Sequence, residues 1–185
     1  MENTISLRKN KIFLRLAAVA LSVTASVIFV QLFHYAGMIS GLDAAVGAAL
    51  LPMHIPVLIS GFLCGPAVGF AVGSLSPVIS FLISGMPTSA LLPFMVIELA
   101  VYGLVSGALS KTKLPLFASV LTAQTAGRIA RAMAVVFAIY IIGNESLTLA
   151  SIKTFILSGI FGIVIQWVAV PLAVEKMKGL RKYYE

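Results

Sequence analysis

The sequence predicts an all-α membrane protein, a bundle of six transmembrane helices with its N- and C-termini in the cytoplasm. Of the 185 residues, 60% are hydrophobic and only 10% are charged, and the mean hydropathy is +1.08. Soluble domains carry about 25% charged residues, so this composition excludes an ordinary soluble protein. Apolar windows of roughly 20 residues, enough to cross a ~30 Å hydrocarbon core, recur along the whole chain. We therefore expect a single transmembrane domain over residues 1–185.

Short turn-forming segments divide the apolar sequence into six stretches. These segments are "YAGMISGLD", "CGP", "SGMPTS", "SKTKLP" and "GNES", all rich in residues that end helices. The expected helices cover residues 12–33, 47–64, 66–84, 90–110, 115–142 and 150–173. The break at 64–66 is so short that the second and third helices must form a tight hairpin. The fifth stretch is long, and we expect it to tilt or to project beyond the bilayer.

Basic residues precede the first apolar run, as they do in a secretory signal peptide. The run continues for about 20 residues, however, which is longer than a signal-peptide core, and no convincing cleavage site follows. We interpret it as a retained first helix. The single cysteine, Cys64, excludes an internal disulfide and a cysteine-cluster metal site.

The distribution of cations predicts the orientation. Ten of the 13 lysines and arginines lie before the first helix or in its first turn, between the fourth and fifth helices, or after the sixth. They are Arg8, Lys9, Lys11, Arg15, Lys111, Lys113, Lys176, Lys178, Arg181 and Lys182. With six spans all ten fall on one side, which the positive-inside rule makes cytoplasmic. The net charge of +7 is then a topology signal, and no nucleic-acid partner is expected.

Small residues at four-residue spacing predict where helices pack. Lipid tails are as apolar as leucine, so membrane helices associate through close backbone approach at small side chains. The rows are Ala18, Ser22 and Ser26 in the first helix, Gly65, Gly69 and Gly73 in the third, and Ala118, Thr122, Ala126, Ala130, Ala134 and Ala138 in the fifth. We expect packing within the chain for the third and fifth helices. The small face of the first helix could equally serve a partner protein.

Strongly polar residues interrupt the fourth and fifth stretches. A charge at mid-bilayer costs roughly 2.5–3.5 kcal/mol on insertion scales, so each needs a reason. Glu98 lies in the outer half of the fourth helix, with Tyr102 one turn further in. Gln124, Arg128 and Arg131 share one face of the fifth helix. Either Glu98 pairs with an arginine and orients two helices, or the arginine face meets an anionic or hydrogen-bonding ligand in a water-accessible cavity.

The same reasoning assigns the two sides of the fifth helix. The polar face lies roughly opposite Ala126, so we expect the alanine side to pack and the other side to present charge. Gln166, in the sixth helix, is expected to form an interhelical hydrogen bond. At the outer helix ends, His34, Tyr35, Asp43 and Asn144 could rim or gate a pocket, although each alone is also ordinary loop chemistry.

The segment "LLPMHIP" places a histidine between two prolines. Pro52 and Pro56 each remove a backbone donor, so the second helix is expected to bend there and to free carbonyls near residues 48 and 52. His54 could bond such a carbonyl or a water. We favour this structural role over direct ligand contact.

Catalytic motifs are absent from the sequence. It contains no G-x(4)-G-K-[ST] phosphate loop, no H-E-x-x-H and no G-x-S-x-G. We therefore expect no enzyme. Uphill transport would need energy from a partner or from an ion gradient.

The segments "LLPMHIPVLISGFLCGPAVGFAVGSLSP", "PFMVIELAVYGLVSGAL" and "AGRIARA" carry a family resemblance. Together with the basic N-terminus and the alanine-rich first helix, they resemble the substrate-binding S component of an energy-coupling factor (ECF) vitamin transporter. The resemblance covers nearly the whole chain, and these segments look similar to a pantothenate-type branch of the family.

The resemblance implies a mechanism. Such a subunit, in the bacterial cell membrane, captures a scarce vitamin from outside and topples when docked on a transmembrane coupling protein. Two partner ATPase subunits bind the ATP, so no cofactor is expected on this chain. The family docks through an A-x-x-x-A pattern of the first helix, which here reads Ala18-x-x-x-Ser22, with Ala25 and Ser26 beside it.

The resemblance also implies a pocket made by the outer parts of helices four to six and by the loop after helix one. Arg128 and Arg131 would meet a carboxylate or phosphate-like group, and Glu98 and Tyr102 would bond hydroxyl or amide groups. The candidate substrate-binding set is completed by Gln124, His34, Asn144 and His54. Pantothenate is compatible with these residues, and so are pyridoxine-type compounds, cobamide precursors and cobalamin.

Three rival functions fit the sequence less well. A secondary transporter with inverted repeats should have a counterpart of the Pro-His-Pro segment in its second half, and none is clear. A membrane enzyme using His54 or Glu98 lacks a second catalytic group at a recognisable spacing. A nickel or cobalt carrier uses its free amino terminus, whereas this "MHI" is internal and follows Pro52. No metal site is expected.

Overall fold

The structure, a computed structural model, is helical in the part of the chain that it describes. The described residues are 2–41, 47, 49–143, 148, 150, 153–154, 157, 159–181 and 184, with side chains from residue 11 onward. The helices are α1 (Glu2–Ser40), α3 (His54–Cys64), α4 (Pro66–Ser84), α5 (Leu92–Leu109), α6 (Leu116–Tyr140) and α8 (Ile160–Arg181). Within the described residues there is no strand, so the all-α class is confirmed.

The first helix is longer than expected. The sequence predicted residues 12–33, but α1 has 39 residues and ends at Ser40. At 1.5 Å per residue it is about 58 Å long, more than a ~30 Å hydrocarbon core requires. Gly37 does not end the helix, because a single glycine inside a helix costs only ~1 kcal/mol. The helix ends at Gly41, whose φ of +70° suits a C-terminal cap.

The second predicted helix is broken. Instead of a bent helix over 47–64, the chain leaves helical geometry at residues 51–53, and α3 begins at His54. Pro52 disfavours the α conformation in the residue before it. That residue, Leu51, has a φ of +49°, the only positive φ among the described non-glycine residues. Two prolines therefore produce a break rather than the expected kink.

The later helices agree more closely with the expected ranges. α4 has the expected bounds, and α5 and α6 differ from theirs by one or two residues at each end. Much of the first part of the sixth stretch, 150–173, lies outside the described residues. α8 continues to Arg181, and Lys178 and Arg181 in its last turn complement the negative end of the helix dipole.

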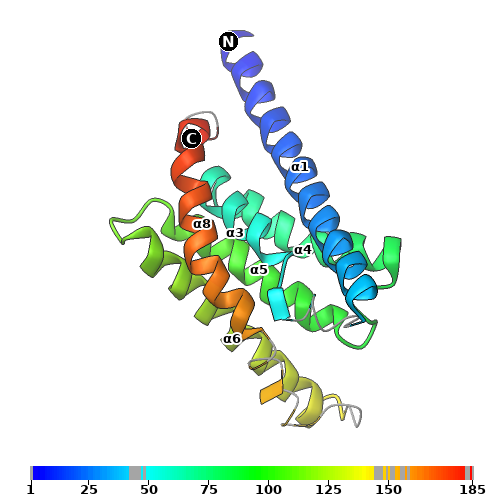
Figure 1. Ribbon diagram of the computed structural model, residues 1–185. Helices are drawn as coiled ribbons and strands as arrows, with labels where there is room; N and C mark the ends of the chain where they lie inside the picture. Colours follow the sequence, from blue (N-terminus) through cyan, green and yellow to red (C-terminus); the bar gives the residue numbers. More distant parts are fainter. Residues whose placement is uncertain are drawn as a thin grey trace.

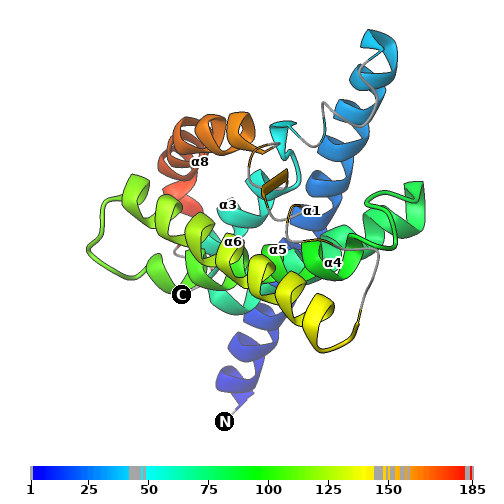
Figure 2. The ribbon, with the colours of Figure 1, turned by 90° about the horizontal axis from the view of Figure 1, so that it is seen from below.

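α3 and α5 occupy the middle of the bundle. α3 contacts α1, α4, α5 and α8, and α5 contacts α3, α4 and α6. In Figure 2, α8 lies on the opposite side of α3 from α4, and α6 runs across the front of α5. The side chains of α3 and α5 thus form the core from which a site can be built.

Glycines allow α3, α4 and α5 to touch backbone to backbone. A Cβ atom added to Gly69 would lie 2.2 Å from the carbonyl oxygen of Gly103, and one added to Gly73 would lie 2.1 Å from that of Leu99. The predicted packing of the third helix within the chain is therefore confirmed at these two positions. Gly65 has a different use: its φ of +91° makes the tight turn between α3 and α4.

The predicted assignment of the two sides of α6 is wrong in the middle of the helix, although Ala138 of the alanine row is buried and Ala134 packs beside it, as expected. The buried face carries the polar residues Gln124 and Arg131 together with Gly127, while Thr122 on the alanine row is exposed and Ala126 is half-buried. Polar side chains of neighbouring helices provide the partners that make this burial possible. The face expected to present charge is the one that packs.

The small face of α1 packs within the chain. Ala18 and Ser26 are buried, Ser22 and Ala25 are half-buried, and α1 contacts α3 and α4. The Ser26 hydroxyl donates to the carbonyl of Ser22 at 2.9 Å. A docking role for these residues stays a prediction, and contact with a partner at Ala18 or Ser26 requires α1 to move.

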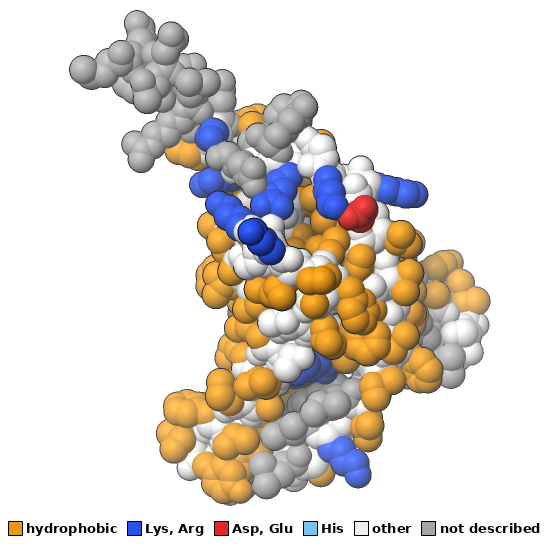
Figure 3. Space-filling model, turned by 90° about the vertical axis from the view of Figure 1, so that its left-hand side faces the viewer, with side chains coloured by type: hydrophobic (Ala, Val, Ile, Leu, Met, Phe, Trp, Pro, Cys, Tyr) orange, Lys and Arg blue, Asp and Glu red, His pale blue; other side chains and the backbone are white. Residues whose placement is uncertain are grey.

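Four of the described helices are long and apolar enough to cross a membrane. They are α1 from Lys11 onward, α4, α5 and α8. α3 is shorter, and α6 is not among them because three strongly polar residues interrupt it. α1 begins and α8 ends toward the same end of the molecule (Figure 1), and lysines and arginines gather at one end of the face shown in Figure 3. Which side of the membrane this end meets stays a prediction.

Candidate functional site

Four polar side chains from three helices meet inside the bundle. His54 is the first residue of α3, Glu98 lies in α5, and Arg128 and Arg131 lie one turn apart on α6. Arg131 Nη1 donates to Glu98 Oε2 at 2.6 Å, and Arg128 Nε lies 3.1 Å from Glu98 Oε1. His54 Nε2 is 3.8 Å from the same Oε1 atom, in contact but too far for a hydrogen bond. We call these four residues the ion cluster.

Burial explains why the ion cluster contains both signs of charge. Glu98 is 0% exposed, and an isolated buried carboxylate is strongly unfavourable. Each of its oxygens faces a different guanidinium, so the charge is compensated from two positions on α6. The sequence left open whether Glu98 pairs with one arginine or the arginines face a cavity. In the structure Glu98 contacts both arginines, and one of them also lines a cavity.

That cavity has a volume of about 390 Å³. Its wall is formed by α1, by the segment around the break before α3, by the loop between α4 and α5, by single residues of α5 and α6, and by Thr154 ahead of α8. The lining residues are Val30, His34, Gly47, Leu51, Pro52, Met53, His54, Met86, Pro87, Thr88, Leu91, Met95, Arg131 and Thr154. The cavity therefore combines one guanidinium and two imidazoles with a largely apolar wall.

Tyr102 supports the ion cluster without lining the cavity. It is one turn beyond Glu98, is 0% exposed, and its ring packs edge-on against His54 with ring centres 5.1 Å apart. A Cβ atom on Gly127 of α6 would lie 2.0 Å from the tyrosine ring, so the ring occupies the space that this glycine leaves. Its contacts are those of a packed core residue.

The structure brings some of the predicted substrate-binding residues together and separates others. Arg131, His54 and His34 line the cavity. Glu98 does not line it, but it contacts Arg131, His54 and Arg128. Gln124 lies elsewhere: its amide bonds Gln166 and Trp167. The predicted interhelical hydrogen bond of Gln166 is confirmed. Asn144 and Asp43 lie outside the described residues.

Several lining residues were missed from the sequence. Met53, Met86, Thr88 and Met95 were not selected, because "SGMPTS" was interpreted only as a turn and methionines as ordinary apolar residues. The available signal was weak: a loop of seven described residues between α4 and α5, longer than a tight hairpin needs.

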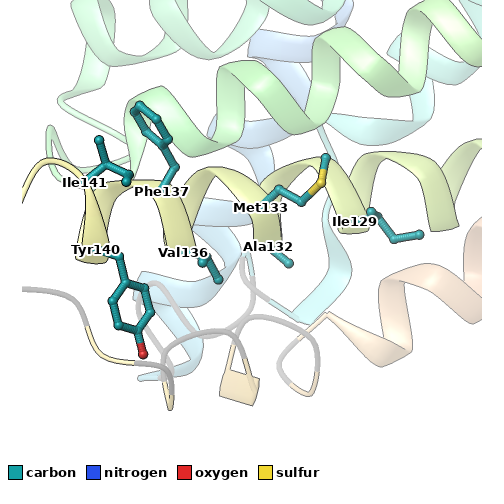
Figure 4. A pocket seen from close by; sticks show the side chains of 7 residues that line it. All are labelled: Ile129, Ala132, Met133, Val136, Phe137, Tyr140 and Ile141. Atoms are coloured by element: carbon teal, nitrogen blue, oxygen red, sulfur yellow. The ribbon is translucent and has the colours of Figure 1, made fainter.

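A second hollow, of about 480 Å³, has no comparable chemistry. It runs along α6 and is lined by Ile129, Ala132, Met133, Val136, Phe137, Tyr140 and Ile141 (Figure 4). Six of the seven side chains come from α6 and the seventh, Ile141, from the residue that follows it; the Tyr140 hydroxyl is the only polar side-chain group among them. An open apolar surface of this kind suits contact with lipid tails. The cavity lined by Arg131 is the candidate site.

Comparison with known proteins gives one match. The family described as "ECF transporter, substrate-specific component" matches residues 14–174. No curated protein and no solved structure matches the chain. The family consists of membrane-integral transporter components, not enzymes, that bind a small-molecule substrate and work with the partners of an ECF module. Because the match covers most of the chain, this protein belongs to the substrate-specific components of ECF transporters.

Proposed function

We propose that this S component captures a small vitamin carrying a carboxylate, with pantothenate as the best candidate, in the 390 Å³ cavity. One observation carries the proposal: Arg131 lines the cavity and is also held by the buried Glu98 at 2.6 Å. A guanidinium presents five N–H donors in a planar fork, so one group can bridge two carboxylates. Glu98 thus pre-orients a donor for an anionic ligand.

The charges of the ion cluster favour an anionic group. Its described members carry two guanidiniums and one carboxylate, which is a formal charge of +1 when His54 is neutral. A ligand carboxylate in the cavity would meet the Arg131 guanidinium, which Glu98 already orients. Charge-assisted hydrogen bonds in a site shielded from water are among the stronger polar interactions.

The size of the cavity supports a small vitamin. Ligand pockets span about 300–1,000 Å³, and this one lies near the lower limit. Pantothenate and pyridoxine-type compounds are compatible with that volume, whereas cobalamin, with its corrin ring, is far larger. Pantothenate also offers hydroxyls and an amide for His34, His54 and Thr88, and two methyl groups for the methionines.

The transport cycle that we propose follows the division of labour in the family. The chain spans a bacterial cell membrane six times, binds the vitamin from outside, and topples to release it inside when docked on the coupling protein. Two ATPase subunits supply the energy. α1 contacts the coupling protein with its small-residue face, Ala18, Ser22, Ala25 and Ser26, after shifting away from α3 and α4.

The first test is a binding panel on the purified chain. Isothermal calorimetry and thermal shift with pantothenate, pyridoxine and cobalamin should show that pantothenate binds and stabilises the protein. Stabilisation by pyridoxine instead would reassign the vitamin but keep the site. If no compound of the panel binds, the proposed cavity function is wrong.

A further inference from the structure

A directional row of hydrogen bonds joins α6, α8 and the break before α3. Trp167 Nε1 donates to Gln124 Oε1 at 2.7 Å, and Gln124 Nε2 donates to Gln166 Oε1 at 2.8 Å. Gln166 Nε2 then donates to the carbonyl oxygen of Leu51 at 3.4 Å. An indole N–H can only donate and a backbone carbonyl can only accept, so the two ends fix the orientation of both amides. We call Trp167, Gln124 and Gln166 the amide relay.

The relay ends on a residue in an unfavourable conformation. Leucine at a φ of +49° is disfavoured by contact of its Cβ atom with the backbone, and such a residue persists only when its surroundings hold it. The Leu51 carbonyl accepts a second hydrogen bond, from the His54 amide at 3.1 Å, and the Leu51 amide donates to Gly47 at 3.1 Å. Gln166 is the side chain that bonds this carbonyl.

α8 supports the same segment from behind. A Cβ atom on Gly162 would lie 2.5 Å from the carbonyl oxygen of Leu50, and one on Gly159 would lie 2.7 Å from the Leu51 side chain. The start of α8 therefore packs directly on residues 49–51, and Gln166 follows Gly162 one turn later on the same helix. Backbone contact and side-chain hydrogen bond act on one short segment.

The segment held in this way is a wall of the cavity. Leu51, Pro52, Met53 and His54 all line it, whereas no member of the amide relay does. The conformation of Leu51 sets the direction of the three residues that follow, including the histidine of the ion cluster. We propose that Gln166, supported by Gln124 and Trp167, is a positioning residue that fixes this wall of the substrate cavity. Its importance for substrate rests on the function proposed above.

A test that needs no vitamin measures the wall directly. The only cysteine, Cys64, is first removed by the substitution Cys64→Ala. A reporter cysteine is then introduced by Met53→Cys. Met53 is 2% exposed, so its labelling by a small methanethiosulfonate reagent reports local opening. Adding Gln166→Leu should raise the labelling rate about fivefold, as expected for the loss of one side-chain hydrogen bond.

The matched reporter is Met95→Cys, on the α5 side of the same cavity. Its labelling rate should not change when Gln166→Leu is added. An unchanged rate at Met53→Cys, or an equal rise at both reporters, would overturn the proposal, because Gln166 would then be without effect or only a general stabiliser. Gln166→Met, which keeps the length of the side chain but has no amide to donate to Leu51, repeats the test should Gln166→Leu not fold.

A rescue variant tests the role of the strained leucine. In Leu51→Gly the positive φ carries no Cβ penalty, so Gln166→Leu should raise labelling at Met53→Cys less than it does with Leu51 present. An equal rise in both backgrounds would contradict the role of the strain.

Affinity links the relay to substrate. Gln166→Leu should raise the dissociation constant for pantothenate about fivefold, measured well below the unfolding temperature. Trp167→Phe should raise it less, because that variant keeps the hydrogen bond from Gln166 to Leu51. Unchanged affinity of Gln166→Leu for a vitamin that the wild type binds would contradict the positioning role. If the wild-type chain does not bind pantothenate, the proposed function fails, and the labelling experiment still decides the role of Gln166.

Discussion

At the scale of single residues, Glu98 organises the site. It is fully buried in α5 and contacts side chains of two other helices, the arginines of α6 and His54 of α3. Removing one member of a buried ionic group leaves the other charges buried without a partner of opposite sign. This lowers the stability of the protein more than replacing the whole group by apolar side chains would. The ion cluster is therefore both a stabilising contact and the base on which Arg131 is oriented.

Glu98→Gln should destabilise the protein strongly. The amide keeps the shape of the side chain but leaves two buried guanidiniums without their carboxylate, and breaking such a group costs about 3–5 kcal/mol. Thermal unfolding of the purified protein measures the change. The control is Ile97→Val, at an exposed neighbouring position of α5, which should change little. A loss below ~1 kcal/mol for Glu98→Gln would show that the carboxylate does not hold these helices.

Arg131 and Arg128 should differ in their effect on binding. Both contact Glu98, but of the two only Arg131 lines the cavity. Arg131→Gln should therefore weaken vitamin binding by about 10- to 100-fold, the value of a charge-assisted hydrogen bond, whereas Arg128→Gln should mainly lower the unfolding temperature. Calorimetry on the folded fraction separates the two effects. Equal losses of affinity in the two variants would contradict the claim that Arg131, and not Arg128, contacts the ligand.

At the scale of helices, glycines determine how close the central elements come. Gly69 and Gly73 of α4 meet the backbone of α5 at Gly103 and Leu99. This contact places Glu98, next to Leu99, at a fixed depth in the bundle. The four-residue spacing of glycines was visible in the sequence, but the partner helix was not, because spacing indicates a face and says nothing of what covers it.

Gly69→Ala should destabilise this contact. The added Cβ atom would lie 2.2 Å from the Gly103 carbonyl oxygen, and because that atom is backbone the helices must separate. Overpacking of this kind costs about 1–3 kcal/mol, to be read from thermal unfolding. Gly179→Ala in α8 is the matched control: nothing lies within 4 Å of its added Cβ atom, so it should be neutral or stabilising. If the two variants behave alike, the close approach of α4 and α5 is not under strain.

At the scale of the whole molecule, α3 and α6 depend on the other helices for their place in the bundle. Neither is among the helices that are long and apolar enough to cross a membrane by themselves, yet both contact α5. α6 buries its arginines against Glu98, so the polar groups that lower its hydropathy are satisfied inside the protein. A polar helix can then cross because its neighbours, not lipid, surround the charges.

The crossing of α6 can be tested by labelling from the two sides of the membrane. In the Cys64→Ala background, Tyr140→Cys reports one end of α6 and Lys113→Cys the loop before its other end; both positions are exposed. A membrane-impermeant maleimide should label Tyr140→Cys in intact cells and Lys113→Cys only after permeabilisation. Labelling of both from the same side would show that α6 does not cross and that the six-span arrangement is wrong.

Much of the fold could be predicted because it depends on local properties. Composition and apolar run length indicated an all-helical membrane protein, and the bounds of α4 followed from Gly65, Pro66 and Gly85, which end or begin helices through their own backbone geometry. The break at Leu51 was harder. Prolines predict a disturbance, but whether a helix bends or breaks depends on what can hold the unfavourable residue, and here Gln166 lies 115 positions away.

Composition, run length and motifs were enough to predict the class of protein, the helical stretches, the family resemblance and the set of polar residues that need a partner inside a membrane. Which of these residues meet became clear only from the packing of the helices. Glu98 received both arginines and His54, while Gln124, on the same face of α6 as Arg131, joined Gln166 instead. Periodicity places a side chain on a face of its own helix, but its partner depends on the tilt and depth of helices distant in sequence, which only packing sets.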